Sequence, residues 1–328
     1  MLKLFEKSTV VQALVILLVT ALLWFKSFIN PQPMMPTDNY APLYNLLCSL
    51  HPSPVLSTII AMTLVVLGGF FFNIMVAGVG LASQNSLLPT LLFIMAMSAV
   101  SPALTPSLLA ALIVIAIIKM LMLRSSLLAV SSDKIFGVAS LIGIASMIYL
   151  PALTLVAAYL LIAVNYRLYS WRDWMVFLLG LLAPYLLLWS VQLFTDDLVD
   201  GFAAMGDELS NLTLTVGSFS TLQSIANITL LAAFLVSLFV VWRRLGEKPI
   251  VWQKNATTVM LVTVAAIAML PFTQVYPVNL QFFAVPFAFC LSQRFALSSH
   301  RSRTSRSSWR SHLFDILFIL ILIAAVVC

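Results

Sequence analysis

The stretch VLSTIIAMTLVVLGGFFFNIMVAGVGL, residues 55–81, holds 27 consecutive residues without Asp, Glu, Lys, Arg or His. As a helix it would be about 40 Å long, and the hydrocarbon core of a bilayer is about 30 Å thick. A polar turn, ASQNS at 82–86, follows it directly. This run therefore predicts a membrane-spanning helix.

The composition of the whole chain agrees with that prediction. Hydrophobic residues make up 62% of it, charged residues only 9%, and the mean hydropathy is +1.08. Soluble domains carry about 25% charged residues, which excludes an ordinary soluble domain. Only helices and closed barrels satisfy their backbone in lipid, and the apolar runs here are continuous and do not alternate as barrel strands do. We expect an all-α, polytopic transmembrane helical bundle, with residues 1–328 forming a single integral-membrane domain.

The apolar runs predict about eleven helices, and several of these are short and paired by Pro turns. Pro102 and Pro106 mark the first such turn, and Leu150-Pro151 marks the second. Discontinuous helices of this kind line binding sites in transporters, and the alternative is short helices in a locally thinned bilayer. The expected helices are 9–28, 55–81, 87–100, 106–123, 135–149, 152–166, 174–194, 228–242, 257–272, 278–295 and 313–328.

Threading these helices through a bilayer separates the charges. Sixteen of the 17 lysines and arginines fall on one side, and six of the 11 carboxylates fall on the other. Cytoplasmic loops retain Lys and Arg. We therefore expect a multi-pass protein of the cell inner (plasma) membrane with a cytoplasmic N-terminus. The basic segment 296–312 is expected to be a cytoplasmic linker that contacts anionic lipid headgroups, and not a nucleic-acid-binding element.

The outer side carries the residues that offer chemistry. Asp38 lies in the first outer loop, where a carboxylate would act as a general base or hold a metal ion; the alternative is a helix cap. Lys26, near the outer end of the first helix, would bind a lipid phosphate, or else extend its ammonium to the headgroups. His51 lies on the same side.

A second group of outer candidates is the acidic segment 196–208. The spacing of Asp196, Asp197 and Asp200 would gather two carboxylates on one helical face, and the alternative is a solvated acidic loop. No fixed metal-ligand motif is present, so no metal site and no cofactor are predicted. Asp315 is the one carboxylate expected within a membrane helix, which argues against an ion-coupled pump.

Turn motifs with aromatic neighbours recur along the chain: APLY at 41–44, NSLLP at 85–89, YLP at 149–151, WRDW at 171–174 and PY at 184–185. They resemble an uncharacterised family of multi-pass inner-membrane proteins from Bacteroidota. That family is distantly similar to polytopic glycosyltransferases and polysaccharide polymerases that use polyprenyl-phosphate-linked sugars. Those enzymes place an acidic residue in the first outer loop, which only Asp38 matches. The resemblance implies a catalytic Asp38, with Lys26 in place of the outer arginines that hold the lipid phosphate.

Three functions follow from these features. The first is envelope glycan assembly on a polyprenyl-phosphate-linked sugar at the periplasmic face, which would make the protein a glycosyltransferase-like membrane enzyme. Asp38 would be catalytic, and Lys26, His51, Asp196, Asp197 and Asp200 would bind the substrate. The second is a transporter or lipid flippase, which predicts a midplane cavity. The third is a non-catalytic membrane assembly subunit. Membrane lipids are the expected partners, and the sequence indicates no particular protein partner.

Overall fold

The computed structural model is helical and contains no strand in the residues that it describes, which are 9–37, 40–82, 86–98, 103–122, 131–166, 170–196, 198–210, 233–243, 245–269 and 281–293. Within these residues, four helices are long and apolar enough to cross a membrane: α1 (Thr9–Ile29), α3 (Pro54–Gly78), α8 (Trp171–Phe194) and α11 (Ile250–Ala268). The prediction of an all-α bundle with membrane-spanning helices is confirmed. The expected last helix, 313–328, and the basic linker before it lie outside the described residues.

Shorter apolar helices fill the space between the long ones. They are α4 (Leu88–Ser98), α5 (Pro106–Leu121), α6 (Ser132–Ile148), α7 (Leu155–Tyr166), residues 233–243 and the helix Gln281–Gln293. With 11 residues, α4 is about 16 Å long, roughly half the thickness of the hydrocarbon core. A short 3₁₀ helix, η2 (Leu150–Thr154), joins α6 to α7 at Pro151. The prediction of short helices is therefore confirmed, and so is the Pro turn at 150–151; Pro102 of the other predicted turn lies outside the described residues.

Proline and hydroxyl residues determine where the helices begin. Pro54 and Pro106 occupy the first helical positions of α3 and α5, where a missing N–H costs no hydrogen bond. The hydroxyl of Ser53 accepts a hydrogen bond from the Leu56 N–H, and Thr105 does the same for Leu108, both at 3.3 Å. These caps satisfy backbone donors that the first turn leaves free.

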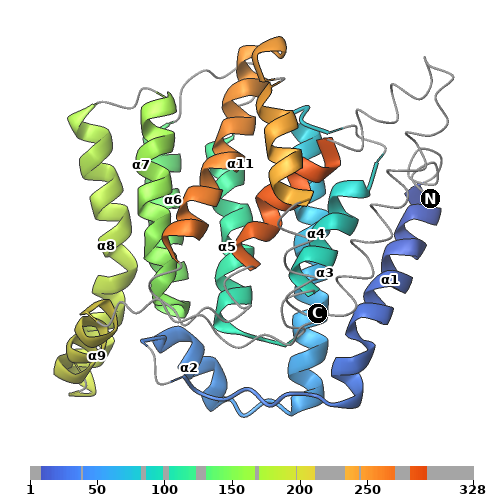
Figure 1. Ribbon diagram of the computed structural model, residues 1–328. Coiled ribbons are helices and arrows are strands. Elements are labelled where there is room, and N and C mark those ends of the chain that lie inside the picture. Colours follow the sequence, from blue (N-terminus) through green and yellow to red (C-terminus); the bar gives the residue numbers. More distant parts are fainter. Residues whose placement is uncertain are drawn as a thin grey trace, which may run out of the picture.

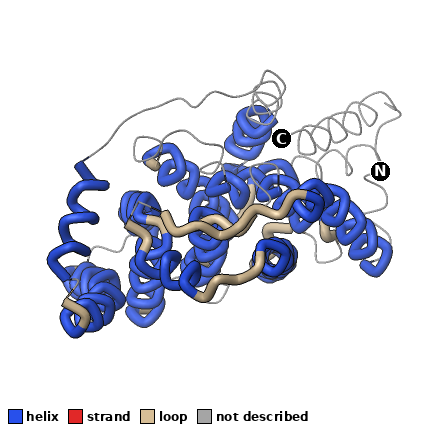
Figure 2. The backbone as a smooth tube through the Cα atoms, turned by 90° about the horizontal axis from the view of Figure 1, so that it is seen from below, coloured by secondary structure: helices blue, strands red, loops and turns tan. Residues whose placement is uncertain are grey.

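The helices stand side by side, with α8 at one edge of the bundle and α1 at the other (Figure 1). Two further helices, α2 (Pro42–Ser49) and α9 (Leu198–Ser210), lie at one end of the bundle. Figure 2 views the bundle from that end, where loops cross the ends of the helices. At the centre, α6 packs most extensively against α8 and α5.

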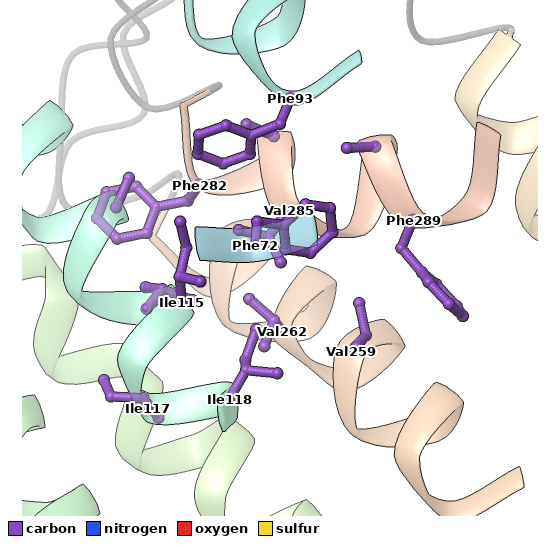
Figure 3. Packing of buried hydrophobic residues seen from close by; sticks show 14 of the residues in the cluster. Phe72, Phe93, Ile115, Ile117, Ile118, Val259, Val262, Phe282, Val285 and Phe289 are labelled. Atoms are coloured by element: carbon purple, nitrogen blue, oxygen red, sulfur yellow. The ribbon is translucent and has the colours of Figure 1, made fainter. Parts of the chain in front are cut away.

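Burial differs sharply between central and edge helices. Every residue of α4 except Ala96 is buried, whereas α8 buries only Phe177, Gly180 and Tyr185. The apolar side chains that α8 exposes suit contact with lipid tails. In the core, aromatic and aliphatic side chains of α3, α4, α5, α11 and the helix 281–293 meet (Figure 3), and the rings of Phe72 and Phe93 stack 5.7 Å apart.

Two glycines allow α6 and α8 to approach closely. A Cβ atom on Gly180 would lie 2.7 Å from the carbonyl oxygen of Phe136, and one on Gly143 would lie 2.9 Å from that of Leu181. Small residues are enriched where membrane helices touch, because they let the two backbones come together. The Ser140 hydroxyl also donates to the Gly180 carbonyl across this contact, at 3.0 Å.

Gly180→Ala should destabilise the protein by about 1–3 kcal/mol, because the added methyl group overlaps backbone atoms that cannot move aside. Gly78→Ala is the matched control: its Cβ meets nothing within 4 Å. Thermal unfolding of both variants in one detergent measures the difference. Equal unfolding temperatures for the two variants would show that the α6–α8 contact is not as close as described.

Candidate functional site

The described charges lie at the two ends of the bundle. One end, the basic end, holds the end of α5, the starts of α6, α8 and α11, and the end of the 233–243 helix (Figure 1). Its described cations are Lys119, Lys134, Arg172, Arg243, Lys248 and Lys254, accompanied by Asp133, Asp173 and Glu247. The opposite, acid-bearing end carries Asp196, Asp200, Asp207 and Glu208, together with Lys26 and His51. Between them, the buried polar side chains of the described residues are all hydroxyls and amides.

Side-chain hydrogen bonds hold the first segment of the acid-bearing end against the bundle. The Asn45 amide accepts from the Thr37 N–H at 3.1 Å and donates to the Thr37 carbonyl at 3.3 Å. The Tyr44 hydroxyl donates to the Leu104 carbonyl at 3.2 Å, which ties α2 to the turn before α5. Asp38 follows Thr37 directly and lies outside the described residues. The N-cap of α2 is Ala41, and no side chain caps this helix.

A long-range hydrogen bond joins this segment to α9. The backbone N–H of Tyr40 donates to a carboxylate oxygen of Glu208 at 2.6 Å. Glu208 is half-buried; burial raises the pKa of its carboxyl above the ordinary 4.5, and the Tyr40 hydrogen bond partly opposes that shift. The segment that precedes α2 and the acidic segment are therefore neighbours at Tyr40 and Glu208, and Asp38 lies two residues before Tyr40 in the sequence.

Apolar contacts of α9 hold Glu208 beside Tyr40. The side chains of Met205 and Leu209 pack against the buried cluster of Tyr40, Met147, Leu150 and Tyr185. The rings of Phe202 and Trp189 lie 4.9 Å apart, and the Tyr185 hydroxyl is 2.7 Å from that of Ser146. Since Phe202, Met205 and Leu209 recur at helical spacing, one face of α9 is apolar and its acidic residues lie elsewhere on the helix.

The other predicted site residues are spread over the same end. Lys26 is exposed in the last turn of α1, which lies at the opposite edge of the bundle from α9 (Figures 1 and 2). His51 is exposed just after α2, has a φ of 45°, and its Nδ1 lies 2.6 Å from the Ser49 carbonyl oxygen. The structure thus brings neither residue to the acidic helix.

The acidic residues themselves are arranged differently from the expected helical face. Helix α9 begins at Leu198, so Asp196 precedes it, with a φ of 60°, while Asp200 is exposed in its first turn. Asp197 lies outside the described residues. Among the described residues, no three His, Cys, Asp or Glu side chains are close enough to hold a metal ion.

A small cavity lies within the bundle between α5, α6, α7 and α11. Apart from Tyr159 its lining is aliphatic: Val114, Ile117, Ile118, Leu121, Ile142, Leu155, Ala158, Ile162 and Val262. Such a lining offers few hydrogen bonds to a polar solute.

Comparisons with known proteins found no match: no family model fits the chain, and no curated protein or solved structure is similar to it.

The raised pKa of Glu208 predicts a pH dependence. The Glu208 carboxyl keeps its proton to a higher pH in the folded chain than in the unfolded chain. Its contribution to the free energy of unfolding is therefore fully present below pH 4.5 and is lost as the pH rises through the folded-state pKa. Glu208→Gln should reduce this loss of stability with rising pH. The amide oxygen of the glutamine still accepts the hydrogen bond from the Tyr40 N–H, but the side chain does not ionise.

Thermal unfolding of the wild type and Glu208→Gln across this pH range checks the sign. Asp207→Asn, which alters an exposed neighbour, is the control and should follow the wild type. An unchanged slope in Glu208→Gln would contradict the assignment.

Proposed function

We propose that this chain is a multi-pass inner-membrane protein that acts at its acid-bearing end, in envelope glycan assembly from a polyprenyl-phosphate-linked sugar. The described lysines and arginines other than Lys26 gather at the basic end, and cytoplasmic segments retain Lys and Arg. The N-terminus and the basic end then lie in the cytoplasm, and the acid-bearing end faces the periplasm.

The hydrogen bond between Glu208 and Tyr40 is the observation that best supports this proposal. It joins two segments that are 168 residues apart in sequence, and both contain carboxylates. In such a glycosyl transfer a carboxylate serves as the general base that takes the proton of an acceptor hydroxyl. The hydroxyl oxygen bonds to the anomeric carbon of the sugar, and the lipid phosphate leaves with the electrons of the broken C–O bond. Asp38 is the proposed base, and it lies two residues before Tyr40, whose N–H donates to Glu208.

Lys26 has a more limited part in this proposal. Its position on α1, away from α9, suits a first contact with the phosphate of a lipid arriving from the outer leaflet. His51, Asp196, Asp197 and Asp200 would bind hydroxyl groups of the acceptor glycan around the same end. The small cavity between α5, α6, α7 and α11 is almost wholly apolar and does not by itself favour the alternative of a transporter or flippase.

Asp38→Asn should abolish the glycan product, because the amide cannot accept the proton. Lys26→Ala should reduce the product without abolishing it. The measurement is the envelope glycan profile of cells in which each variant replaces the wild-type protein.

Asp207→Asn is the matched control, since it removes an exposed carboxylate of the same end and should leave the profile unchanged. Normal glycans in Asp38→Asn, at wild-type protein levels, would contradict the proposal and favour a non-catalytic assembly subunit.

A further inference from the structure

Three buried or half-buried polar side chains meet where two short helices begin. The Ser107 hydroxyl, in the first turn of α5, donates to the side-chain oxygen of Gln281 at 2.6 Å. The Thr105 hydroxyl lies 3.4 Å from the same oxygen and 3.1 Å from the Ser107 hydroxyl. Gln281 begins the helix Gln281–Gln293, so the contact joins segments 174 residues apart.

This junction has an unused hydrogen-bonding group. Gln281 is fully buried, and its Nε2 has no hydrogen-bond partner among the described residues. Exchanging the oxygen and nitrogen positions of the Gln281 amide does not supply the missing hydrogen bond. The nitrogen would then lie beside Ser107, and the oxygen would be the atom without a partner. A buried polar atom without a hydrogen-bond partner lowers the free energy of unfolding by about 1–3 kcal/mol. Such a group at a site of function therefore indicates that a ligand or an ordered water supplies the partner.

The surroundings of Gln281 suit a neutral polyhydroxylated ligand. Two hydroxyls and one primary amide supply both donors and acceptors, and none of the described side chains in this contact is charged. The next residue, Phe282, stacks on Tyr149 at 5.9 Å, so an aromatic pair adjoins the polar groups. Sugar rings present hydroxyls at their edges and apolar C–H faces, which such a combination matches.

The junction is also near the acid-bearing end. Thr105 is only half-buried, and the residue before it, Leu104, accepts the hydrogen bond from Tyr44 of α2. Leu109 and Ile113 of α5 pack against the cluster that contains Tyr44. The polar junction therefore adjoins α2, the helix that follows the Asp38 segment.

We propose that this junction is a sugar-binding subsite, in which Gln281, Ser107 and Thr105 bind hydroxyl groups of the sugar that the lipid carries. The inference rests on the proposed function, since it assigns a position to the donor sugar of that reaction. The amide of Gln281 contributes the bond that is unused in the free protein, and Ser107 and Thr105 orient it.

The test compares two lipids with the full chain in nanodiscs: undecaprenyl phosphate carrying glucose, and undecaprenyl phosphate alone. The wild type should bind the sugar-bearing lipid about tenfold more tightly, the equivalent of one well-made hydrogen bond. Gln281→Leu should bind both lipids equally, with an unchanged Kd for the bare lipid. The leucine removes the unpartnered Nε2 together with the oxygen that accepts from Ser107. The Ser107 hydroxyl keeps the Thr105 hydroxyl as a partner at 3.1 Å, so the fold should be retained.

Thr90→Val is the matched control. The Thr90 hydroxyl, in α4, is fully buried and also has no partner among the described residues, but it makes none of the contacts of the junction. This variant should keep the wild-type preference for the sugar-bearing lipid. Thermal unfolding of both variants separates loss of folding from loss of binding.

The outcomes distinguish the subsite from the wider function. A preference for the sugar that persists in Gln281→Leu overturns the subsite and leaves the proposed function intact. A wild type that binds both lipids equally also overturns the subsite, while the glycan profile of Asp38→Asn still tests the reaction. A wild type that binds neither lipid contradicts both.

Discussion

The exclusion of charge from the interior of the bundle is the constraint on which the rest of the structure depends. A charged side chain or an unpaired backbone group in hydrocarbon is costly, so the chain places its described Lys, Arg, Asp and Glu residues towards the two ends of the bundle. The polar residues that remain inside are uncharged, and eight of the 16 described ones that are buried bond to the preceding turn of their own helix. Thr20 donates to Ile16, Ser237 to Ala233 and Thr263 to Met260. These bonds satisfy the hydroxyls without the help of water.

This constraint concentrates the chemistry at the ends, and the two ends differ. At the basic end, cations lie over aromatic rings, as Lys254 does over Tyr166 and Lys119 over Phe71. At the acid-bearing end, α2 buries Tyr44 and Cys48, and Met205 and Leu209 of α9 pack against a buried cluster, while Asp200 and Asp207 of α9 are exposed. The Glu208–Tyr40 hydrogen bond joins these two pieces. A surface assembled in this way suits a reaction on a lipid-linked substrate, whose head group lies at the same level.

Much of the fold could be predicted from the sequence, because helix positions depend on local signals. Uninterrupted apolar runs marked α1, α3 and α8, and Pro106 marked the start of α5. Helix α9 was not predicted, since acidic residues and two glycines interrupt its apolar pattern within a segment expected to be an outer loop. The spacing of Phe202, Met205 and Leu209 was the one signal that could have indicated it.

The candidate site was less predictable, because it depends on contacts between distant segments. Glu208 belonged to the acidic segment, but nothing in the sequence indicated that it contacts Tyr40. Lys26 and the acidic segment were expected on the same side, but the order of helices across the bundle separates them. The contact of Ser107 with Gln281 likewise follows only from the packing of α5 against the helix 281–293.

Cysteine labelling of sidedness tests the central claim most directly. Asp200→Cys and Arg243→Cys would each be introduced into a chain whose three native cysteines are replaced by serine. Intact cells would then be treated with a maleimide that cannot cross the inner membrane but reaches the periplasm. The account predicts labelling at position 200 and none at position 243 until the membrane is opened. Labelling at 243 with protection at 200 would place the acid-bearing end in the cytoplasm and contradict the account.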